Sequence, residues 1–216
     1  LGLGASGPQV IEGWHGVPYD RPLQRTREIV EICRMVWKRQ EVRYAGRVIK
    51  LPLPADQGTG LGKALKILTH PARDRIPIYL ASMGDRSVEL TAELAEGWLP
   101  IFFIPEKADA IWGKALRRGF EKRSRELAPL EVSAGGALAI GEGLEGLRDR
   151  ERPHLALYVG GMGARDKNFY NDLVRLYGYE QEAKEIQDLY LSGQKQAAEA
   201  RVPTELLESL SLIGPE

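Results

Sequence analysis

Two consecutive stretches of the sequence each run from an apolar strand through a short loop into an amphipathic helix. The first stretch is Ile76–Ala81, followed by the loop Ser82–Arg86 and a helical pattern through Leu94. The second begins with Trp98–Ile104, and Pro105 opens the helix that follows. Strands as apolar as these have no face suited to water, so they fit a parallel sheet that helices cover on the outside. The sequence therefore predicts the α/β fold class.

The rest of the chain continues this alternation. Asp20 is a suitable N-cap for an amphipathic helix over Pro22–Arg39, and Val42–Ile49 has the alternation of a small hairpin. The loop Leu51–Gly62 is rich in Pro and Gly, and we expect it to be mobile. Further strands are expected at Leu1–Gly4, Val132–Ile140 and Leu210–Ile213, and further helices at Arg148–Val159, Asn168–Tyr177 and Glu180–Leu191.

The number of strands leaves the architecture open between a doubly wound sheet and a (β/α)8 barrel. A barrel needs eight strands and about 250 residues. The 216 residues supply four or five strands, and the chain begins at Leu1 inside an expected strand. We therefore expect a fragment of a longer protein.

Charge and composition exclude several classes of partner. The 30 basic and 30 acidic side chains cancel, and without a basic stripe neither nucleic acid nor an anionic membrane is expected as a partner. No apolar run reaches membrane-spanning length, so the expected location is cytoplasmic. Cys33 is the single cysteine, and the spacing of the three histidines does not fit a metal triad, so we predict no metal. Of these, His15 lies in an expected loop, whereas His70 and His154 are expected to be structural.

Gly2–Gly7 spells G-x-G-x-x-G, the pattern of a dinucleotide-binding turn. That assignment needs a long helix after the third glycine and then a second strand ending in an acidic residue. Gly13–Pro18 ends any such helix early, and a capped helix stands where the second strand should be. The pattern therefore predicts a strand-to-loop turn with exposed backbone N–H groups rather than a Rossmann site.

Three long segments together resemble one family over nearly the whole chain: GASGPQVIEGWHGVPYDRPLQRTREIVEI, IPIYLASMGDRSVELTAELAEGWLPIFFIPE and RPHLALYVGGMGARDKNFYNDLVRLYGYEQEAKEIQDLYLSG. They resemble the luciferase-like monooxygenase superfamily, in the branch of oxidoreductases that use the deazaflavin coenzyme F-420 (also written F420) and are similar to methylenetetrahydromethanopterin reductase. The resemblance implies that residues 1–216 are one luciferase-like (β/α)8 TIM-barrel domain, here partial, with about strands 4 to 8. The first three strands and the last helix would be absent, and with them much of the ring pocket, so we name no catalytic residue.

The resemblance also implies a cofactor site at the carboxyl ends of the strands. Ala5, Ser6 and Gly7 would contact the cofactor after the fourth strand, and Ser82, Met83, Gly84 and Arg86 would hold its phosphate after the fifth. A helix N-terminus beside Arg86 is suited to an anion. The alternative for the first loop is an ordinary turn, and for the second a loop that only caps its helix.

Gly160–Arg165 is rich in glycine, but no lysine follows at the P-loop position. We interpret it as a flexible connection near the pocket, with Asn168, Tyr170 and Asn171 as candidate substrate contacts. The aromatic residues Trp98, Phe102, Phe103, Trp112 and Phe120 are interpreted as packing.

The function that the resemblance implies is hydride transfer between coenzyme F-420 and a small organic substrate, by an enzyme that forms a homodimer. One alternative is a monooxygenase that uses flavin mononucleotide (FMN), because the family uses either cofactor. A second alternative is a cofactor-binding paralogue without catalysis, since fold alone does not establish chemistry.

Overall fold

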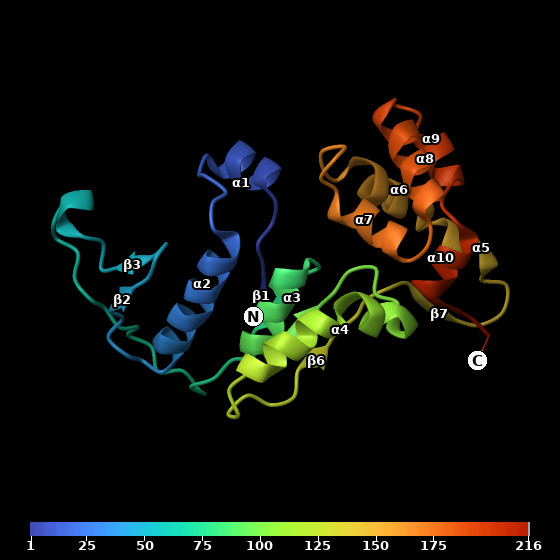
Figure 1. Cartoon of the computed structure of the whole chain (residues 1–216). Helices are drawn as coiled ribbons and strands as arrows, with labels where there is room; N and C mark the ends of the chain where they lie inside the picture. The colour runs from blue at the N-terminus through green and yellow to red at the C-terminus, as the bar shows by residue number, and fades with distance from the viewer. Residues whose placement is uncertain (216) are drawn as a thin grey trace. The chain divides into compact units, whose positions relative to one another are not determined.

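The structure is a computed structural model that describes residues 1–215; Glu216 lies outside the described residues. The chain forms two compact units. Unit 1 contains residues 1–100 and 115–133, and unit 2 contains residues 101–114 and 134–216. Figure 1 labels the helices and strands of both units.

Unit 1 is built on a four-stranded parallel sheet in the order β1-β4-β5-β6. Its strands are β1 (Gly2–Gly4), β4 (Tyr79–Ala81), β5 (Gly97–Leu99) and β6 (Glu131–Val132). Each strand pairs with the next sheet strand along the chain, which is the order that successive strand–helix units produce. The α/β class with a parallel sheet is therefore confirmed.

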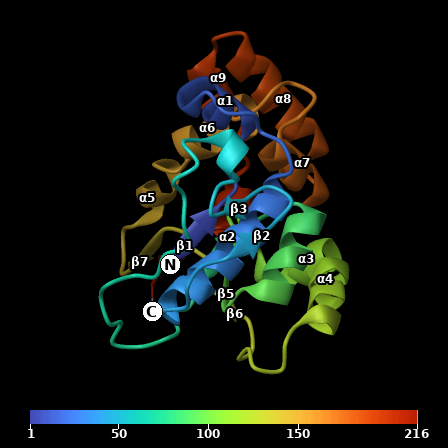
Figure 2. The ribbon, with the colours of Figure 1, turned by 90° about the vertical axis from the view of Figure 1, so that its left-hand side faces the viewer.

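Four helices belong wholly or partly to unit 1: α1 (Pro8–His15), α2 (Pro22–Trp37), α3 (Asp85–Leu94) and the second half of α4 (Pro105–Lys122). Val30 of α2 packs with Ile78, Leu80 and Ala95 in the core of this unit. In both views α3 and the α4 half lie side by side (Figures 1 and 2). Gly119 allows this approach, because a Cβ there would lie 2.4 Å from the Glu89 carbonyl oxygen.

The hairpin is formed by the antiparallel strands β2 (Tyr44–Ala45) and β3 (Lys50–Leu51), and the short 3-10 helix η1 (Ala55–Gln57) follows it. Glu28, fully buried on α2, holds the hairpin turn by accepting hydrogen bonds from the backbone N–H groups of residues 47–49. Burial acts to raise the pKa of this carboxyl, but the hydrogen bonds from Gln24 and from the turn outweigh it and lower the pKa. Glu28 is thus a structural carboxylate.

Unit 2 contains a two-stranded parallel sheet and a group of helices. The strands are β7 (Leu138–Ile140) and β8 (Leu212–Gly214). The helices are α5 (Glu145–Asp149), α6 (Arg152–Gly161), α7 (Phe169–Leu176), α8 (Glu180–Leu191), α9 (Lys195–Ala200) and α10 (Thr204–Ser209). The buried apolar side chains of this unit come mainly from these helices, including Leu155, Val159, Val174, Ile186, Leu206 and Leu207.

Several sequence-based boundaries are wrong. The strand expected over 132–140 is two strands, β6 and β7, which belong to different sheets. The strand expected over 98–104 ends at Leu99, because Pro100 follows and Phe102 has a left-handed φ of 50°. The helix expected over 148–159 is divided into α5 and α6.

The helix start at Pro22 is confirmed, but its expected N-cap is wrong. Arg21, with φ 45°, occupies the N-cap position in place of Asp20, and no side chain caps the helix. Phe120, expected to pack in the core, is 45% exposed. Trp98, Phe102 and Trp112 are buried as expected.

Candidate functional site

The sheet of unit 1 places the two predicted cofactor loops next to each other. β1 and β4 are parallel neighbours, with Gly4 opposite Ala81 as the last residue of each strand. Ala5 and Ser82 are the next residues, so the loops Ala5–Gly7 and Ser82–Arg86 start side by side at the carboxyl edge of the sheet. This edge is where α/β proteins place ligands.

The loop after β1 contains a strained residue. Ser6 has φ 55°, which L-residues other than Asn, Asp and Gly rarely adopt, and its hydroxyl group has no hydrogen-bond partner within residues 1–215. The Tyr19 hydroxyl donates a 3.0 Å hydrogen bond to the Ser6 carbonyl, and the Tyr19 N–H donates to Glu12 on α1. Strain of this kind occurs where the surrounding structure holds a residue for a function.

Helix α1 shows which kind of turn the glycine pattern of Gly2–Gly7 forms. It begins directly after Gly7, has eight residues and ends at Gly16, which has a left-handed φ of 63°. The next element is α2 rather than a second strand. The prediction of a strand-to-loop turn instead of a Rossmann site is confirmed.

The loop after β4 leads into the N-terminus of α3, where Gly84 is the N-cap and no side chain provides a cap. The N–H groups of Ser87 and Val88 bond to the Gly84 carbonyl, whereas those of Asp85 and Arg86 have no acceptor within the described part of the chain. The Asp85 carboxylate forms an ion pair with Arg118 at 2.7 Å, which offsets its charge. The helix N-terminus is therefore available to an anion.

Arg86 supplies an exposed positive charge at the same place. Its side chain is exposed and forms no ion pair or hydrogen bond within residues 1–215. A guanidinium group suits bidentate binding to phosphate. Met83, also predicted here, is half-buried.

Ser82 differs from the other members of this loop because its hydroxyl proton is already used. Thr91 Oγ1 donates to the Ser87 carbonyl, so in the 2.8 Å bond between Ser82 Oγ and Thr91 Oγ1 the donor is Ser82. The Ser82 carbonyl accepts a bond from the buried Trp98 indole. Ser82 thus ties β4 to α3 and has no free donor for a phosphate oxygen.

The predicted substrate contacts Asn168 and Asn171 are buried and fully engaged in unit 2. Asn168 caps α7 by accepting from the N–H groups of Tyr170 and Asn171, and it donates to the Tyr158 and Val159 carbonyls. Asn171 donates to Val159 and Ala183 and accepts from Arg175. Both side chains are therefore structural in this arrangement. Tyr170, half-buried, has no such bonds.

Each histidine has different surroundings. His15 is exposed in the last turn of α1 rather than in a loop, His70 contacts Arg39 at 3.2 Å, and His154 stacks on Tyr158. Among residues 1–215, no group of three His, Cys, Asp or Glu side chains is placed to hold a metal ion. No helix in the described residues is long and apolar enough to cross a membrane.

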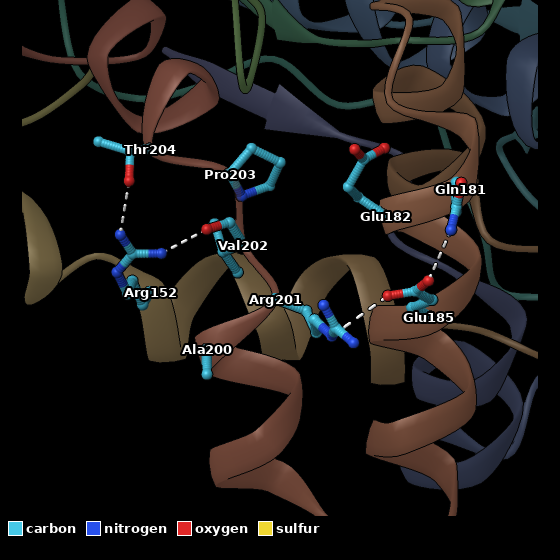
Figure 3. Close-up of a pocket in the computed structure, with 9 residues that line it drawn as sticks. All are labelled: Arg152, Gln181, Glu182, Glu185, Ala200, Arg201, Val202, Pro203 and Thr204. Carbon is cyan, nitrogen blue, oxygen red and sulfur yellow. Dashed lines mark hydrogen bonds and ion pairs between the residues drawn. The ribbon is translucent and has the colours of Figure 1, made fainter.

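A polar pocket of about 440 Å³ lies in unit 2, between α6, α8 and the segment 200–204 (Figure 3). Its charged groups Arg152, Glu185 and Arg201 are paired, whereas Glu182 has no ion-pair or hydrogen-bond partner within the described residues. Arg152 donates to the Val202 carbonyl and to Thr204. Glu185 accepts from Gln181 and forms an ion pair with Arg201 at 3.2 Å. These bonds join the helices, and the pocket holds none of the predicted site residues.

The sequence analysis did not identify two residues that shape these loops. Tyr19 holds the Ser6 carbonyl, and Thr91 orients Ser82. The position of Thr91 on α3 gave no indication of this role in the sequence.

The parallel sheet places the chain in the class of α/β proteins, and its carboxyl edge carries an uncapped helix N-terminus and an unpaired arginine. Comparison with known proteins narrows this class. A sequence profile described as "Luciferase-like monooxygenase" matches residues 1–216, and the chain belongs to this family.

Three relatives show the extent of the similarity. The chain is 44% identical to "Putative coenzyme F420-dependent oxidoreductase Rv3520c" of Mycobacterium tuberculosis over 99% of its own length and 62% of that protein. It is 27% identical to 5,10-methylenetetrahydromethanopterin reductase of Archaeoglobus fulgidus, over 74% of the chain and 44% of that protein. The solved coenzyme F420-dependent tetrahydromethanopterin reductase of Methanopyrus kandleri has the same fold, with a TM-score of 0.72 and 19% identity over 99% of the chain and 60% of that structure. The chain thus spans about three fifths or less of the length of these relatives.

Proposed function

We propose that the chain is the cofactor-holding part of a coenzyme F420-dependent oxidoreductase that transfers a hydride between this deazaflavin and a small organic substrate. The observation that carries the proposal is the β1–β4 register, which brings the two predicted cofactor loops together at one edge. The names of two relatives support the choice of coenzyme F420. The sheet of unit 1 would be part of a (β/α)8 barrel, from its fourth strand onward.

The residues at this edge would make different contacts with the cofactor. Coenzyme F420 supplies the hydride-carrying ring, and the protein supplies binding and orientation. The N–H groups of Asp85 and Arg86 and the Arg86 guanidinium would hold the phosphate, and the Ser6 hydroxyl would donate to the cofactor chain. Gly7, Ala5 and Gly84 leave room for close approach, whereas Ser82 orients the loop through Thr91.

The test is a fluorescence titration of the chain with coenzyme F420 and, in parallel, with FMN. Arg86→Gln should weaken binding of coenzyme F420 about tenfold, because it removes a charge-assisted contact to phosphate. Arg125→Gln is the matched control, because Arg125 is also exposed and unpaired within the described residues. Arg125 lies near the amino end of β4, since the carbonyl of its neighbour Glu126 accepts a hydrogen bond from Arg75, which precedes β4. Equal losses in the two variants would contradict the assignment of the phosphate to α3.

The description of the matching family favours a second candidate, an FMN-dependent monooxygenase. Saturable binding of FMN in preference to coenzyme F420 would select it. Binding without turnover by the full-length protein would instead select the non-catalytic alternative.

A homodimer and a cytoplasmic location are part of the proposal as expectations from the resemblance and composition. Val10 and Trp14, 45% and 88% exposed on α1, give an apolar surface suited to a second copy. Light scattering of the protein and of Trp14→Ser would test this, since the substitution should shift a dimer toward monomer.

A further inference from the structure

A residue 13 positions further along the chain holds the loop after β1 in place. Helix α1 ends at Gly16, whose left-handed φ of 63° lets the chain turn back toward the start of the helix. There the Tyr19 N–H donates to the Glu12 carboxylate at 3.1 Å, and the Tyr19 hydroxyl donates to the Ser6 carbonyl at 3.0 Å. Tyr19 is thus attached to α1 through its backbone and to the loop before α1 through its hydroxyl group.

The bond from Tyr19 fixes the direction of the peptide group between Ser6 and Gly7. This peptide group is planar and trans, so the Ser6 carbonyl and the Gly7 N–H point in opposite directions. Tyr19 occupies the carbonyl, whereas the Gly7 N–H has no acceptor within residues 1–215. Burial raises the pKa of Tyr19, so its hydroxyl group stays a donor. The Gly7 N–H is therefore held pointing away from Tyr19.

Serine is not the residue that a simple turn favours at position 6. Its φ of 55° is strained for a serine, whereas glycine adopts this conformation readily. A turn that only connected β1 to α1 would be less strained with glycine there. Serine adds a hydroxyl group at this position, so the strain serves the direction of that group. The bond from Tyr19 is the one hydrogen bond that Ser6 forms within residues 1–215.

The second predicted cofactor loop is held in a similar way. The Trp98 indole N–H donates a 2.9 Å hydrogen bond to the Ser82 carbonyl, directly after β4. In both loops an aromatic side chain thus holds the carbonyl of a serine at the carboxyl edge of the sheet. Trp98 is buried on β5, whereas Tyr19 is half-buried between α1 and α2. Tyr19 can therefore be changed without opening the core.

We propose that Tyr19 is a positioning residue of the cofactor site, which holds the Ser6 carbonyl so that the Ser6 hydroxyl group and the Gly7 N–H face acceptor oxygens of the bound cofactor. Tyr19 acts through Ser6 and Gly7, because its own hydroxyl proton is used by the Ser6 carbonyl. The inference rests on the proposed function, since it concerns one of the two loops that would hold coenzyme F420.

The test is a double-mutant cycle, with coenzyme F420 affinity of the chain measured by fluorescence titration. Tyr19→Phe keeps the ring and removes the donor, so binding should weaken about fivefold. Ser6→Ala removes the hydroxyl group that Tyr19 positions and should weaken binding by a similar factor, about fivefold. In the double variant the loss should stay below about tenfold, because most of what Tyr19 positions is already gone, whereas independent effects would multiply to about 25-fold.

Tyr79→Phe is the matched control. The Tyr79 hydroxyl also forms a hydrogen bond in unit 1, to Glu131 at 2.5 Å, but Tyr79 is the first residue of β4 and lies at the opposite end of the strand from the cofactor loops. Its affinity for coenzyme F420 should be unchanged, and circular dichroism verifies that every variant is folded.

The outcomes separate this inference from the proposed function. A parent chain that does not bind coenzyme F420 would contradict the proposed function and the inference with it. If the parent binds, unchanged affinity in Tyr19→Phe, an equal loss in Tyr79→Phe, or a multiplicative loss in the double variant would each overturn the inference alone.

Discussion

The turn before α3 and the turn before α7 both contain glycine and both lead into a helix, but they use their polar groups in opposite ways. Before α7, Asn168 takes up two N–H groups of the helix and gives both amide protons to carbonyls of α6. Before α3, Gly84 provides no side-chain cap, and the first two N–H groups of the helix have no acceptor in the described chain. The α7 turn is closed, and the α3 turn is open to an anion.

The glycines of the two turns differ in the same sense. In the turn before α7, a Cβ at Gly163 would lie 2.6 Å from the Lys167 carbonyl oxygen, and at Gly160, in the last turn of α6 that precedes it, a Cβ would lie 2.5 Å from Tyr190 Cβ. A Cβ at Gly84 would meet nothing closer than Ser87 Oγ at 3.6 Å. Glycine in the α7 turn serves packing, whereas at Gly84 it leaves space. The difference teaches that glycine content alone does not identify a phosphate-binding turn. What identifies it is whether the N–H groups at the start of the helix lack an acceptor within the protein.

The largest effect is expected from Gly160→Ala. The new methyl group would clash with Tyr190 on α8 and with the Ile186 carbonyl at 3.2 Å, so unfolding should require about 2 to 3 kcal/mol less free energy. Urea denaturation followed by circular dichroism measures this. Gly146→Ala on α5 is the control: no atom lies within 4 Å of its added Cβ, and it should be neutral or stabilising. Similar losses in the two variants would mean that close packing is not the role of Gly160.

Asn168→Ala should have the next largest effect and lower the free energy of unfolding by about 2 kcal/mol. It removes the cap of α7 and the side-chain donor to the Tyr158 carbonyl, whereas the Val159 carbonyl keeps its bond from Asn171. Asn168→Asp keeps the acceptor for the cap but places a buried carboxylate oxygen against the Tyr158 and Val159 carbonyl oxygens, so its loss should be at least as large. If Asn168 served substrate rather than structure, the Ala variant would instead keep its unfolding free energy in the same denaturation measurement.

The sequence predicted the framework of the sheet because apolar periodicity is a local property. Ile76–Ala81 and Leu1–Gly4 contain β4 and β1, and α8 begins and ends at the expected residues. The strand expected over 132–140 failed because Gly135 and Gly136 interrupt an otherwise apolar run. A Cβ at Gly136 would lie 2.3 Å from the Leu210 carbonyl oxygen, a contact with a segment distant in sequence.

The candidate site also depends on contacts between segments that are distant in sequence. The loops Ala5–Gly7 and Ser82–Arg86 were found from the resemblance and from their places after strands, and the register of β1 and β4 brings them together. Which hydroxyl protons remain free was not predictable. It depends on Thr91 donating to Ser87, which follows from three-dimensional contacts rather than from residue type.

Ser6→Gly should separate stability from binding in the open region. Glycine adopts the left-handed φ of Ser6 without strain, so the variant should gain about 0.5 to 1 kcal/mol of unfolding free energy after its larger chain entropy is included. It also removes the unpaired hydroxyl group, and binding of coenzyme F420 should weaken about fivefold. Ser6→Ala keeps the strain and removes the hydroxyl, so it should lose the same affinity without the gain in stability. Unchanged affinity in both variants would argue that this loop is an ordinary turn.

The smallest effect on stability, and the sharpest test of the comparison, is expected from Gly84→Asn. Gly84 has φ −73° and ψ 151°, which an asparagine N-cap can adopt, so the side chain should accept a bond from the first turn of α3 as Asn168 does in α7. The unfolding free energy should rise by about 0.5 kcal/mol, while binding of coenzyme F420 falls, because the new side chain uses an N–H group that the phosphate would need. Gly84→Ala adds a side chain without a cap and should lose a little stability. A Gly84→Asn protein that is more stable and still binds coenzyme F420 as tightly as the parent would show that the open N–H groups of α3 are not where the phosphate is held.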